Sequence, residues 1–286
     1  MTTARIVFLA RYRIPHAMLT MQFDHFLEGI DRTVIATPVA KQELWPIFRQ
    51  HGIDPSNFDY VNDEEIYLRY PEVNHWMFED DYRGPWLRQQ AIKLSYLDLL
   101  DYDVMLMTDP DTVMIEPYCC WKDNKLNFLA LENETHGSYN GVLESVLGIP
   151  RQTPHCFVTE YLPVVKQDWI ALRQTLEQRH GQHFLDAIID HVPGMPTVPP
   201  WGNGNLIKWF SEYEFLGNWA LTQREVSWQW QRRFEYDSLD KIKNFSRDYN
   251  CFADAVPDLS LSLQMDWNTG RVIDFDHYLS TMKNCL

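Results

Sequence analysis

Val104-Met-Leu-Met-Thr-Asp109-Pro-Asp111-Thr-Val-Met-Ile115 is an apolar run that stops at two carboxylates and then resumes. The five residues between Asp103 and Asp109 predict a β-strand that is buried on both faces. The two acids then follow the carboxyl end of the strand, which is where open α/β sheets bind ligands. Carboxylate oxygens favour Mg²⁺ or Mn²⁺, and such an ion would hold a phosphate group of a ligand.

Two further pairs of aspartates have the same spacing, Asp101 with Asp103 and Asp274 with Asp276. The first pair precedes the buried strand, so we interpret it as a solvated turn. The second pair follows a strand-like segment, Arg271 to Phe275, and stands next to His277. A histidine there is either a further metal ligand from the end of the chain or an ordinary surface histidine.

The composition excludes several classes of function. A chain of 286 residues with 45% hydrophobic residues can fill a sizeable core. Its net charge of −15 argues against a nucleic-acid partner and against an anionic membrane surface, because both require a basic face. The five cysteines are odd in number and lack paired C-x-x-C spacing, so we expect neither a disulfide framework nor a zinc site.

The first apolar run, which ends before Arg11, is too short for a signal peptide or a spanning helix. Together with the cysteines, it predicts a cytoplasmic protein without a membrane anchor of its own.

Strand and helix patterns alternate along the first hundred residues, which predicts a mostly parallel sheet in one continuous α/β domain. No G-x-G-x-x-G or Walker-type loop follows a strand, so a ligand phosphate must be held in another way. The expected strands are Arg5 to Ala10, Thr33 to Ala36 and Phe58 to Val61, and the expected helices are Ala17 to Gly29 and Lys41 to His51.

The next helix is expected from Trp86 to Leu100, with an apolar stripe that packs on the sheet. Gln89 and Lys93 fall on another face, and Lys93 either reaches the carboxylate strand or is solvated. Beyond the central stretch we expect a strand at Leu126 to Leu131, a loop at Thr135 to Ser145, and helices at Asp168 to Glu177 and Phe184 to Val192.

Four segments in the same order over roughly residues 85–220 resemble the glycosyltransferases of the GT-A type, and more narrowly the DUF6492-like group of bacterial and phage proteins. They are Arg88-Gln-Gln-Ala-Ile-Lys-Leu, Asp101-Tyr-Asp-Val-Met-Leu-Met-Thr-Asp-Pro-Asp-Thr-Val, Phe157-Val-Thr-Glu160 and Phe210-Ser-Glu-Tyr-Glu-Phe-Leu-Gly-Asn-Trp219. The resemblance implies a GT-A-like single domain over residues 1–286. Residues 1–118 would form a Rossmann-like half that binds a nucleotide sugar, and residues 119–286 an elaborated acceptor half.

The resemblance also implies roles on the donor side. Asp111 would bind a Mn²⁺ or Mg²⁺ ion that bridges the diphosphate, and Asp109 would contact the ribose or the sugar. Lys93 would be a second cation near the donor, with Gln89 beside it. Arg11 and Tyr12, after the first strand, would lie at the nucleotide base. The further metal ligand expected near the C-terminus is assigned to His277, with His191 and His155 as alternatives.

On the acceptor side, a carboxylate at the start of a helix would deprotonate the attacking hydroxyl. Glu212 and Glu214 are the candidates, and Ser211 is a suitable helix cap. Two residues apart, they point about 200° apart on a helix, so only one can face the site. The alternative is that both are solvated. The turn Trp201 to Gly204 could form the acceptor floor or be a plain turn.

These assignments predict a metal-dependent, inverting glycosyltransferase that moves a sugar from a UDP- or GDP-linked donor to a hydroxyl of a glycan or other acceptor. One alternative is a haloacid-dehalogenase-like phosphatase. That pattern places a Thr four residues after the first Asp, where this chain has Val113, and its acids follow the first strand of the domain. The other alternative is a non-catalytic module that binds a nucleotide or a glycan.

Overall fold

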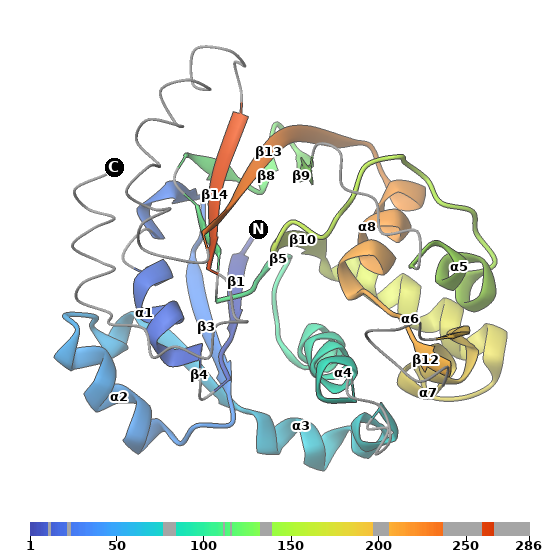
Figure 1. Ribbon diagram of the computed structural model, residues 1–286, viewed down its shortest axis with the longest axis horizontal. Helices are drawn as coiled ribbons and strands as arrows, with labels where there is room; N and C mark the ends of the chain where they lie inside the picture. Colours follow the sequence, from blue (N-terminus) through green and yellow to red (C-terminus); the bar gives the residue numbers. More distant parts are fainter. Residues whose placement is uncertain are drawn as a thin grey trace.

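The computed structural model describes residues 1–10, 13–21, 24–76, 84–110, 112–114, 116–131, 139–196, 206–236 and 259–265 (Figure 1). It is a mixed α/β structure with a mostly parallel central sheet. The strand order of that sheet is β10-β5-β1-β3-β4, and only β10 runs antiparallel to its neighbour. The strands are β1 (Thr3–Phe8), β3 (Arg32–Thr37), β4 (Phe58–Asn62), β5 (Val104–Thr108) and β10 (Tyr161–Val165).

The predicted strand before Asp109 is confirmed as β5, which lies between β1 and β10 with all five residues buried. The strands predicted near residues 5, 33 and 58 are confirmed as β1, β3 and β4. Asp101 and Asp103 are exposed, as expected of a solvated turn. Because β1, β3, β4 and β5 are parallel, their carboxyl ends meet at one edge of the sheet.

Helices cover this sheet and supply the other side of the core. Long apolar side chains of α4, α6 and α7 join those of β5 in one buried cluster, which includes Leu94, Leu106, Leu172 and Ile188. The helices are α1 (Ile14–Met21), α2 (Lys41–Gln50), α3 (Asp63–Arg69), α4 (Gly84–Leu99), α5 (Asn140–Val142), α6 (Lys166–His180), α7 (Phe184–His191) and α8 (Glu212–Gln223). Short 3₁₀-helices span Asp24–Phe26, Pro55–Asn57 and Pro71–Trp76.

Local sequence signals explain where several helices begin and end. The side chain of Ser211 accepts a hydrogen bond from the Glu214 backbone N–H, so the predicted cap of α8 is confirmed. Helix α2 ends just before Gly52, whose φ of 74° is accessible to glycine at little cost. Helix α6 ends in the same way at Gly181, with a φ of 68°.

A second sheet has the order β6-β14-β13-β9-β8 and includes the strand predicted at Leu126 to Leu131, which is β9. Its strands are β6 (Thr112–Met114), β8 (Trp121–Lys122), β9 (Lys125–Leu131), β13 (Val226–Tyr236) and β14 (Leu259–Met265). Two small pairs complete the strands, β2 (Leu27–Glu28) with β7 (Tyr118–Cys119) and β11 (Gly194–Pro196) with β12 (Leu206–Lys208).

Two predicted elements are wrong. The helix expected from Ala17 to Gly29 ends at Met21, because Leu27 and Glu28 pair with residues 118–119 in a parallel bridge. The loop expected from Thr135 to Ser145 is helical from Asn140, where α5 leads into a π-helical turn over Leu143–Leu147. Burial of Leu143, Val146 and Leu147 explains that turn, since these side chains join the core.

Strand β10 was not expected at all, because Pro163 interrupts its apolar run. Proline is tolerated there because β10 is an edge strand of the sheet. None of the helices in the described ranges is long and apolar enough to cross a membrane.

Candidate functional site

The site lies where β5 ends beside the start of β10. Asp109 follows β5 directly, and its backbone N–H donates a hydrogen bond to the carbonyl oxygen of Glu160 at 3.2 Å. Glu160 is buried and has a φ of 64°, a left-handed conformation that non-glycine residues adopt at a cost. The antiparallel pairing of β10 with β5 thus holds a second acid next to Asp109.

Lys93 connects this edge to the start of α8. Its Nζ is 2.7 Å from Asp109 Oδ1 and 2.6 Å from Glu212 Oε1. Only 1% of Lys93 and 1% of Glu212 is exposed, so Lys93 is not the solvated lysine of the alternative interpretation. Buried charges of this kind persist only when they are paired, and here one ammonium group serves two carboxylates. We call Lys93, Asp109 and Glu212 the charged triad.

Neighbouring groups hold the triad in place. The ring of Tyr213 is centred 4.7 Å from Lys93 Nζ, and the ring of Phe8 lies 5.5 Å away, so two aromatic faces support the ammonium group. The Gln90 carboxamide packs against Glu212. In the orientation that satisfies both of its ends, it donates to Glu212 Oε1 at 2.8 Å and accepts from the Trp86 indole N–H at 3.3 Å.

The pKa values of the three charged groups are shifted in different directions. Burial opposes the charge of Lys93, but Asp109 and Glu212 outweigh it and raise the Lys93 pKa. Burial also opposes ionisation of Asp109, but the charge of Lys93, a hydrogen bond with Glu160 and the charge of Arg13 hold its pKa below the usual range. For Glu212, burial and the nearby charge of Asp109 prevail over Lys93 and raise the pKa. Glu212 is therefore the member of the triad best suited to take up a proton.

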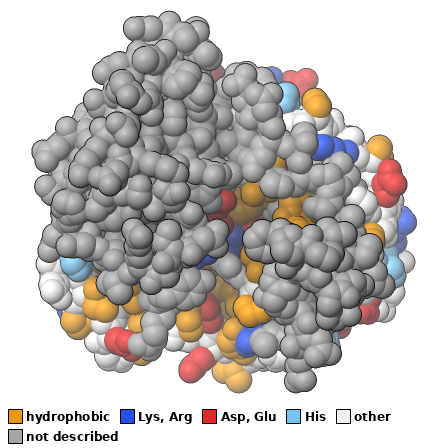
Figure 2. Space-filling model, in the orientation of Figure 1, with side chains coloured by type: hydrophobic (Ala, Val, Ile, Leu, Met, Phe, Trp, Pro, Cys, Tyr) orange, Lys and Arg blue, Asp and Glu red, His pale blue; other side chains and the backbone are white. Residues whose placement is uncertain are grey.

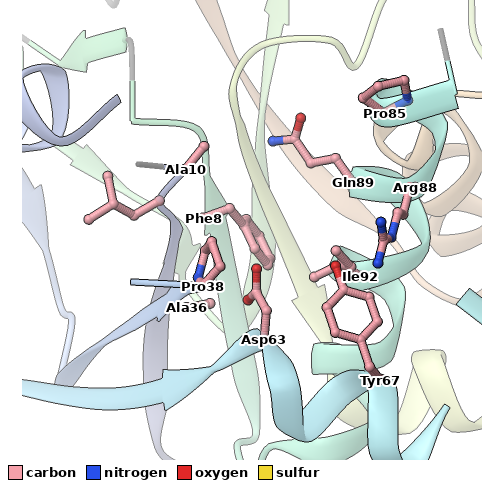
Figure 3. A pocket seen from close by; sticks show the side chains of 11 residues that line it. Phe8, Ala10, Ala36, Pro38, Asp63, Tyr67, Pro85, Arg88, Gln89 and Ile92 are labelled. Atoms are coloured by element: carbon pink, nitrogen blue, oxygen red, sulfur yellow. The ribbon is translucent and has the colours of Figure 1, made fainter. Parts of the chain in front are cut away.

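A cavity of about 310 Å³ opens at the carboxyl ends of β1 and β3 (Figure 3). In this view Asp63 points into the cavity from the start of α3, and Arg88 reaches the ring of Tyr67 from α4. The Arg88 guanidinium lies 4.4 Å from the centre of that ring. The cavity is lined by Phe8, Leu9, Ala10, Ala36, Pro38, Asp63, Tyr67, Pro85, Arg88, Gln89 and Ile92.

Asp63 is the acidic group of this cavity. Its Oδ1 accepts a hydrogen bond from the Tyr96 hydroxyl at 2.8 Å. Burial raises the pKa of Asp63 to about 6, against the hydrogen bond from Tyr96 and the positive charge of Arg88. At neutral pH the cavity therefore presents a poorly solvated carboxylate at one point and a guanidinium group at another. A ligand with hydrogen-bond donors and an anionic group would match both.

The structure brings together three of the predicted site residues, Asp109, Lys93 and Glu212, and places Gln89 in the neighbouring cavity. Glu214 lies on the other side of the α8 start, where its carboxylate accepts from the Phe157 backbone N–H at 2.9 Å and from the Asn218 side chain. Arg11, Tyr12, Asp111 and His277 lie outside the described residues, as do Arg271 to Phe275 and the turn Trp201 to Gly204.

Of the alternative metal ligands, the ring of His155 packs against Trp228, and the ring of His191 contacts that of His180 with a centroid distance of 3.9 Å. The described parts of the chain contain no cluster of three or more His, Cys, Asp or Glu side chains that could hold a metal ion. Within the same residues, Cys119 and Cys120 are free thiols.

Sequence reasoning missed four charged residues of this region. Arg13 acts on Asp109, Glu160 adjoins it, and Asp63 and Arg88 line the cavity. Glu160 and Arg88 belong to the segments that carry the resemblance, so their position there was a usable signal. Asp63 follows a strand in a run of acids, Asp63-Glu-Glu65, which is a common pattern for a helix start and gave no specific signal.

In the space-filling view, a hollow near the centre of the molecule brings hydrophobic, acidic and basic side chains to the surface (Figure 2).

No protein-family model matches the chain, and no curated protein matches it. Among solved structures, a galactosyltransferase, LgtC, in complex with donor and acceptor sugar analogues has a TM-score of 0.46 and 11% sequence identity. The match covers 98% of this chain and 95% of that one. A likeness this remote carries no argument about function, which must come from the site itself.

Proposed function

We propose that this protein is a metal-dependent glycosyltransferase that transfers a sugar from a nucleotide-sugar donor to a hydroxyl group of an acceptor. The observation that carries the proposal is the position of Lys93. It joins Asp109, at the end of β5, to Glu212, at the start of α8, next to a cavity lined by the same helix α4. A cation, an acid on the sheet edge and a buried acid with a raised pKa are the groups that such a transfer needs.

The donor would occupy the cavity and extend toward Asp109. A volume of about 310 Å³ suits a nucleoside, and the aliphatic and aromatic walls suit a flat base. Asp63 would accept hydrogen bonds from the base or the ribose, and Arg88 with Gln89 would face the phosphates. We place Arg11 and Tyr12 at the base and Asp109 at the ribose or sugar. UDP- and GDP-linked sugars are the expected donors.

Charge on the departing nucleoside diphosphate would be stabilised by cations. Lys93 is one, although its two carboxylate partners already neutralise it, so the triad has a net charge of −1 and cannot supply the whole stabilisation. We therefore propose a Mn²⁺ or Mg²⁺ ion with Asp111 and His277 among its ligands, which is the donor chemistry that carboxylate oxygens favour. Bound there, the ion would act as a Lewis acid on the leaving diphosphate.

Glu212 is our candidate for the general base. It is buried and has a raised pKa, and a proton from the acceptor hydroxyl would leave it neutral beside the Lys93–Asp109 pair. The acceptor oxygen would then attack the anomeric carbon while the nucleoside diphosphate leaves from the opposite face, which inverts the configuration. Glu214 is less suited, because its carboxylate holds the Phe157 N–H and the Asn218 side chain.

Incubation of the purified protein with UDP- and GDP-linked sugars and Mn²⁺ tests the proposal. We expect release of the free nucleoside diphosphate, and we expect Asp111→Ala to abolish it. Asp101→Ala is the matched control, because Asp101 is an exposed acid before the same strand, and it should release as much product as the wild type.

Two other results would overturn this reading. A phosphatase would release inorganic phosphate instead, and a binding module would release neither product. Binding of the donor is followed separately by the thermal unfolding transition, which a true donor raises by mass action. If no nucleotide sugar raises it with or without Mn²⁺, the protein is not a transferase of this kind.

A further inference from the structure

Three aromatic side chains that the donor site does not use gather beside Glu212. Trp86 is at the start of α4, Tyr139 precedes α5, and Trp209 stands three residues before Glu212. The rings of Trp86 and Tyr139 are stacked, with centroids 6.5 Å apart and planes inclined by 27°. The ring of Trp209 lies 6.2 Å from that of Tyr139. We call these three residues the aromatic platform.

The platform is connected to the charged triad through one polar side chain. In the orientation that satisfies both ends of its amide, Gln90 accepts from the Trp86 indole N–H and donates to Glu212. Because Trp86, Gln90 and Lys93 are spaced by four and three residues, they form one stripe along α4. Gln90 and Glu212 are themselves buried, so the platform lies next to the charged triad and on its outer side.

Helix α4 separates this place from the nucleoside cavity. The residues of α4 that line the cavity are Pro85, Arg88, Gln89 and Ile92, which form a different stripe of the same helix. The two stripes face different surroundings, since Arg88 lies over Tyr67 of α3 whereas Trp86 stacks on Tyr139. Two chemically different ligands can thus be held on two faces of one rigid element.

The rings of the platform are less buried than the core tryptophans, although Trp86 also packs against the edge of the core. Trp76 and Trp169 show what a core tryptophan looks like in this protein, since neither has any exposed surface. Trp86, Tyr139 and Trp209 instead each remain partly exposed. Partly exposed aromatic rings fit a pyranose ring, whose C–H groups pack on the aromatic ring while its hydroxyls reach polar partners.

We propose that Trp86, Tyr139 and Trp209 bind the sugar ring that accepts the transferred group, so that the acceptor is a glycan. The role of this sugar as the acceptor rests on the proposed function, but binding of a sugar to the three residues can be tested by itself. Without a bound metal and with both acids ionised, the adjoining triad has a net charge of −1, which favours an uncharged sugar over a uronic acid or a phosphorylated sugar.

The test follows the indole N–H signals of ¹⁵N-labelled wild-type protein by NMR. The chain has 11 tryptophans, and Trp86→Phe and Trp209→Phe identify the two signals of interest. The probes are the methyl glycosides of glucose, galactose, mannose and N-acetylglucosamine, and methyl glucuronide as the charged analogue. The signal of Trp45 on α2, which contacts Lys41 and Tyr60, is the internal control.

We expect at least one neutral glycoside to shift the Trp86 and Trp209 signals in a saturable way while Trp45 stays in place. Methyl glucuronide should bind about tenfold more weakly than the best neutral glycoside. Trp209→Leu removes the ring without touching Gln90 and should weaken that binding by about tenfold or more.

The inference is overturned if no glycoside moves the two signals, if Trp45 moves equally, or if the glucuronide binds as well as the neutral sugars. These outcomes come from the wild type, so they decide the matter even if Trp209→Leu does not fold. Failure of the proposed function is separate and visible. In that case the glycoside shifts persist, but no nucleotide sugar is turned over with or without the glycoside.

Discussion

Replacement of Lys93 by methionine isolates the electrostatics of the charged triad. The side chain is 2% exposed and lies 2.7 Å from Asp109 and 2.6 Å from Glu212, whose side chain is also 2% exposed. Methionine keeps most of the volume and flexibility of the lysine stem, so the change removes mainly the charge. It leaves two buried carboxylates facing each other without their common cation.

Removal of one partner from a buried ion pair costs about 3–5 kcal/mol, and we expect Lys93→Met to lose this much free energy of unfolding at pH 8. The loss should shrink at lower pH for a definite reason. In the wild type the pKa of Asp109 is depressed, so its contribution to stability is present above its unfolded pKa and is lost in acid. Without Lys93 the pKa values of both carboxyls rise, and a raised carboxyl pKa costs stability as pH increases. The deficit is therefore larger at pH 8 than at pH 5.

Equilibrium unfolding in urea at the two pH values measures this difference. Lys125→Met is the matched control, because Lys125 Nζ is 2.8 Å from Glu225 but both side chains are solvent-exposed. Exposed ion pairs contribute little, so this variant should unfold like the wild type at both pH values. The reasoning is refuted if Lys93→Met is no more destabilised than Lys125→Met, or if its deficit is the same at pH 5 and pH 8.

Three other substitutions have definite expected outcomes. Glu212→Gln should slow sugar transfer by about 10²–10⁴-fold, without loss of urea stability at pH 8, because the raised pKa of Glu212 means that its charge does not stabilise the fold; normal transfer would exclude it as the base. Asp63→Asn should stabilise the protein by up to about 3 kcal/mol at pH 8 and about half as much at pH 5, since the Asp63 pKa is raised to about 6; equal effects at both pH values would contradict this assignment. Gly217→Ala should cost about 1–3 kcal/mol, because its Cβ would overlap the Phe157 ring, whereas the Cβ of Gly141→Ala would meet its nearest atom at 3.9 Å and serves as the control.

The parallel sheet could be predicted from the sequence because its strands are short apolar runs separated by helix-length segments. Strand β5 illustrates this best, since a run buried on both faces has few other interpretations. Strand β10 shows the limit. Its proline is compatible with a sheet only at an edge, and the edge position is set by tertiary pairing rather than by the local sequence. The helix expected over residues 27–28 is wrong for the same reason, because their partner strand lies 91 residues further along the chain, at 118–119.

The types of residue in the candidate site could be predicted from the sequence, but most of the contacts between them could not. Lys93 and Glu212 are 119 residues apart, and nothing in either segment states that they meet. Periodicity even placed Lys93 off the apolar stripe of α4, which is correct for a helix with one buried face. Helix α4 is buried on nearly all sides, so a position off the stripe lies in the interior and its charge has to find partners.

The net charge of the buried triad explains why we propose Glu212, and not a more exposed acid, as the base. With Lys93 protonated and both acids ionised, the cluster has a net charge of −1 in surroundings that solvate charge poorly. Uptake of one proton at Glu212 leaves a neutral group beside a closed Lys93–Asp109 pair, so the buried cluster becomes more stable when it accepts the proton. Lys93 limits this tendency, because its charge lowers the Glu212 pKa and so opposes the effect of burial. The pKa of Glu212 therefore depends on two neighbours. Lys93 lowers it, and the negative charge of Asp109 raises it and so favours proton uptake.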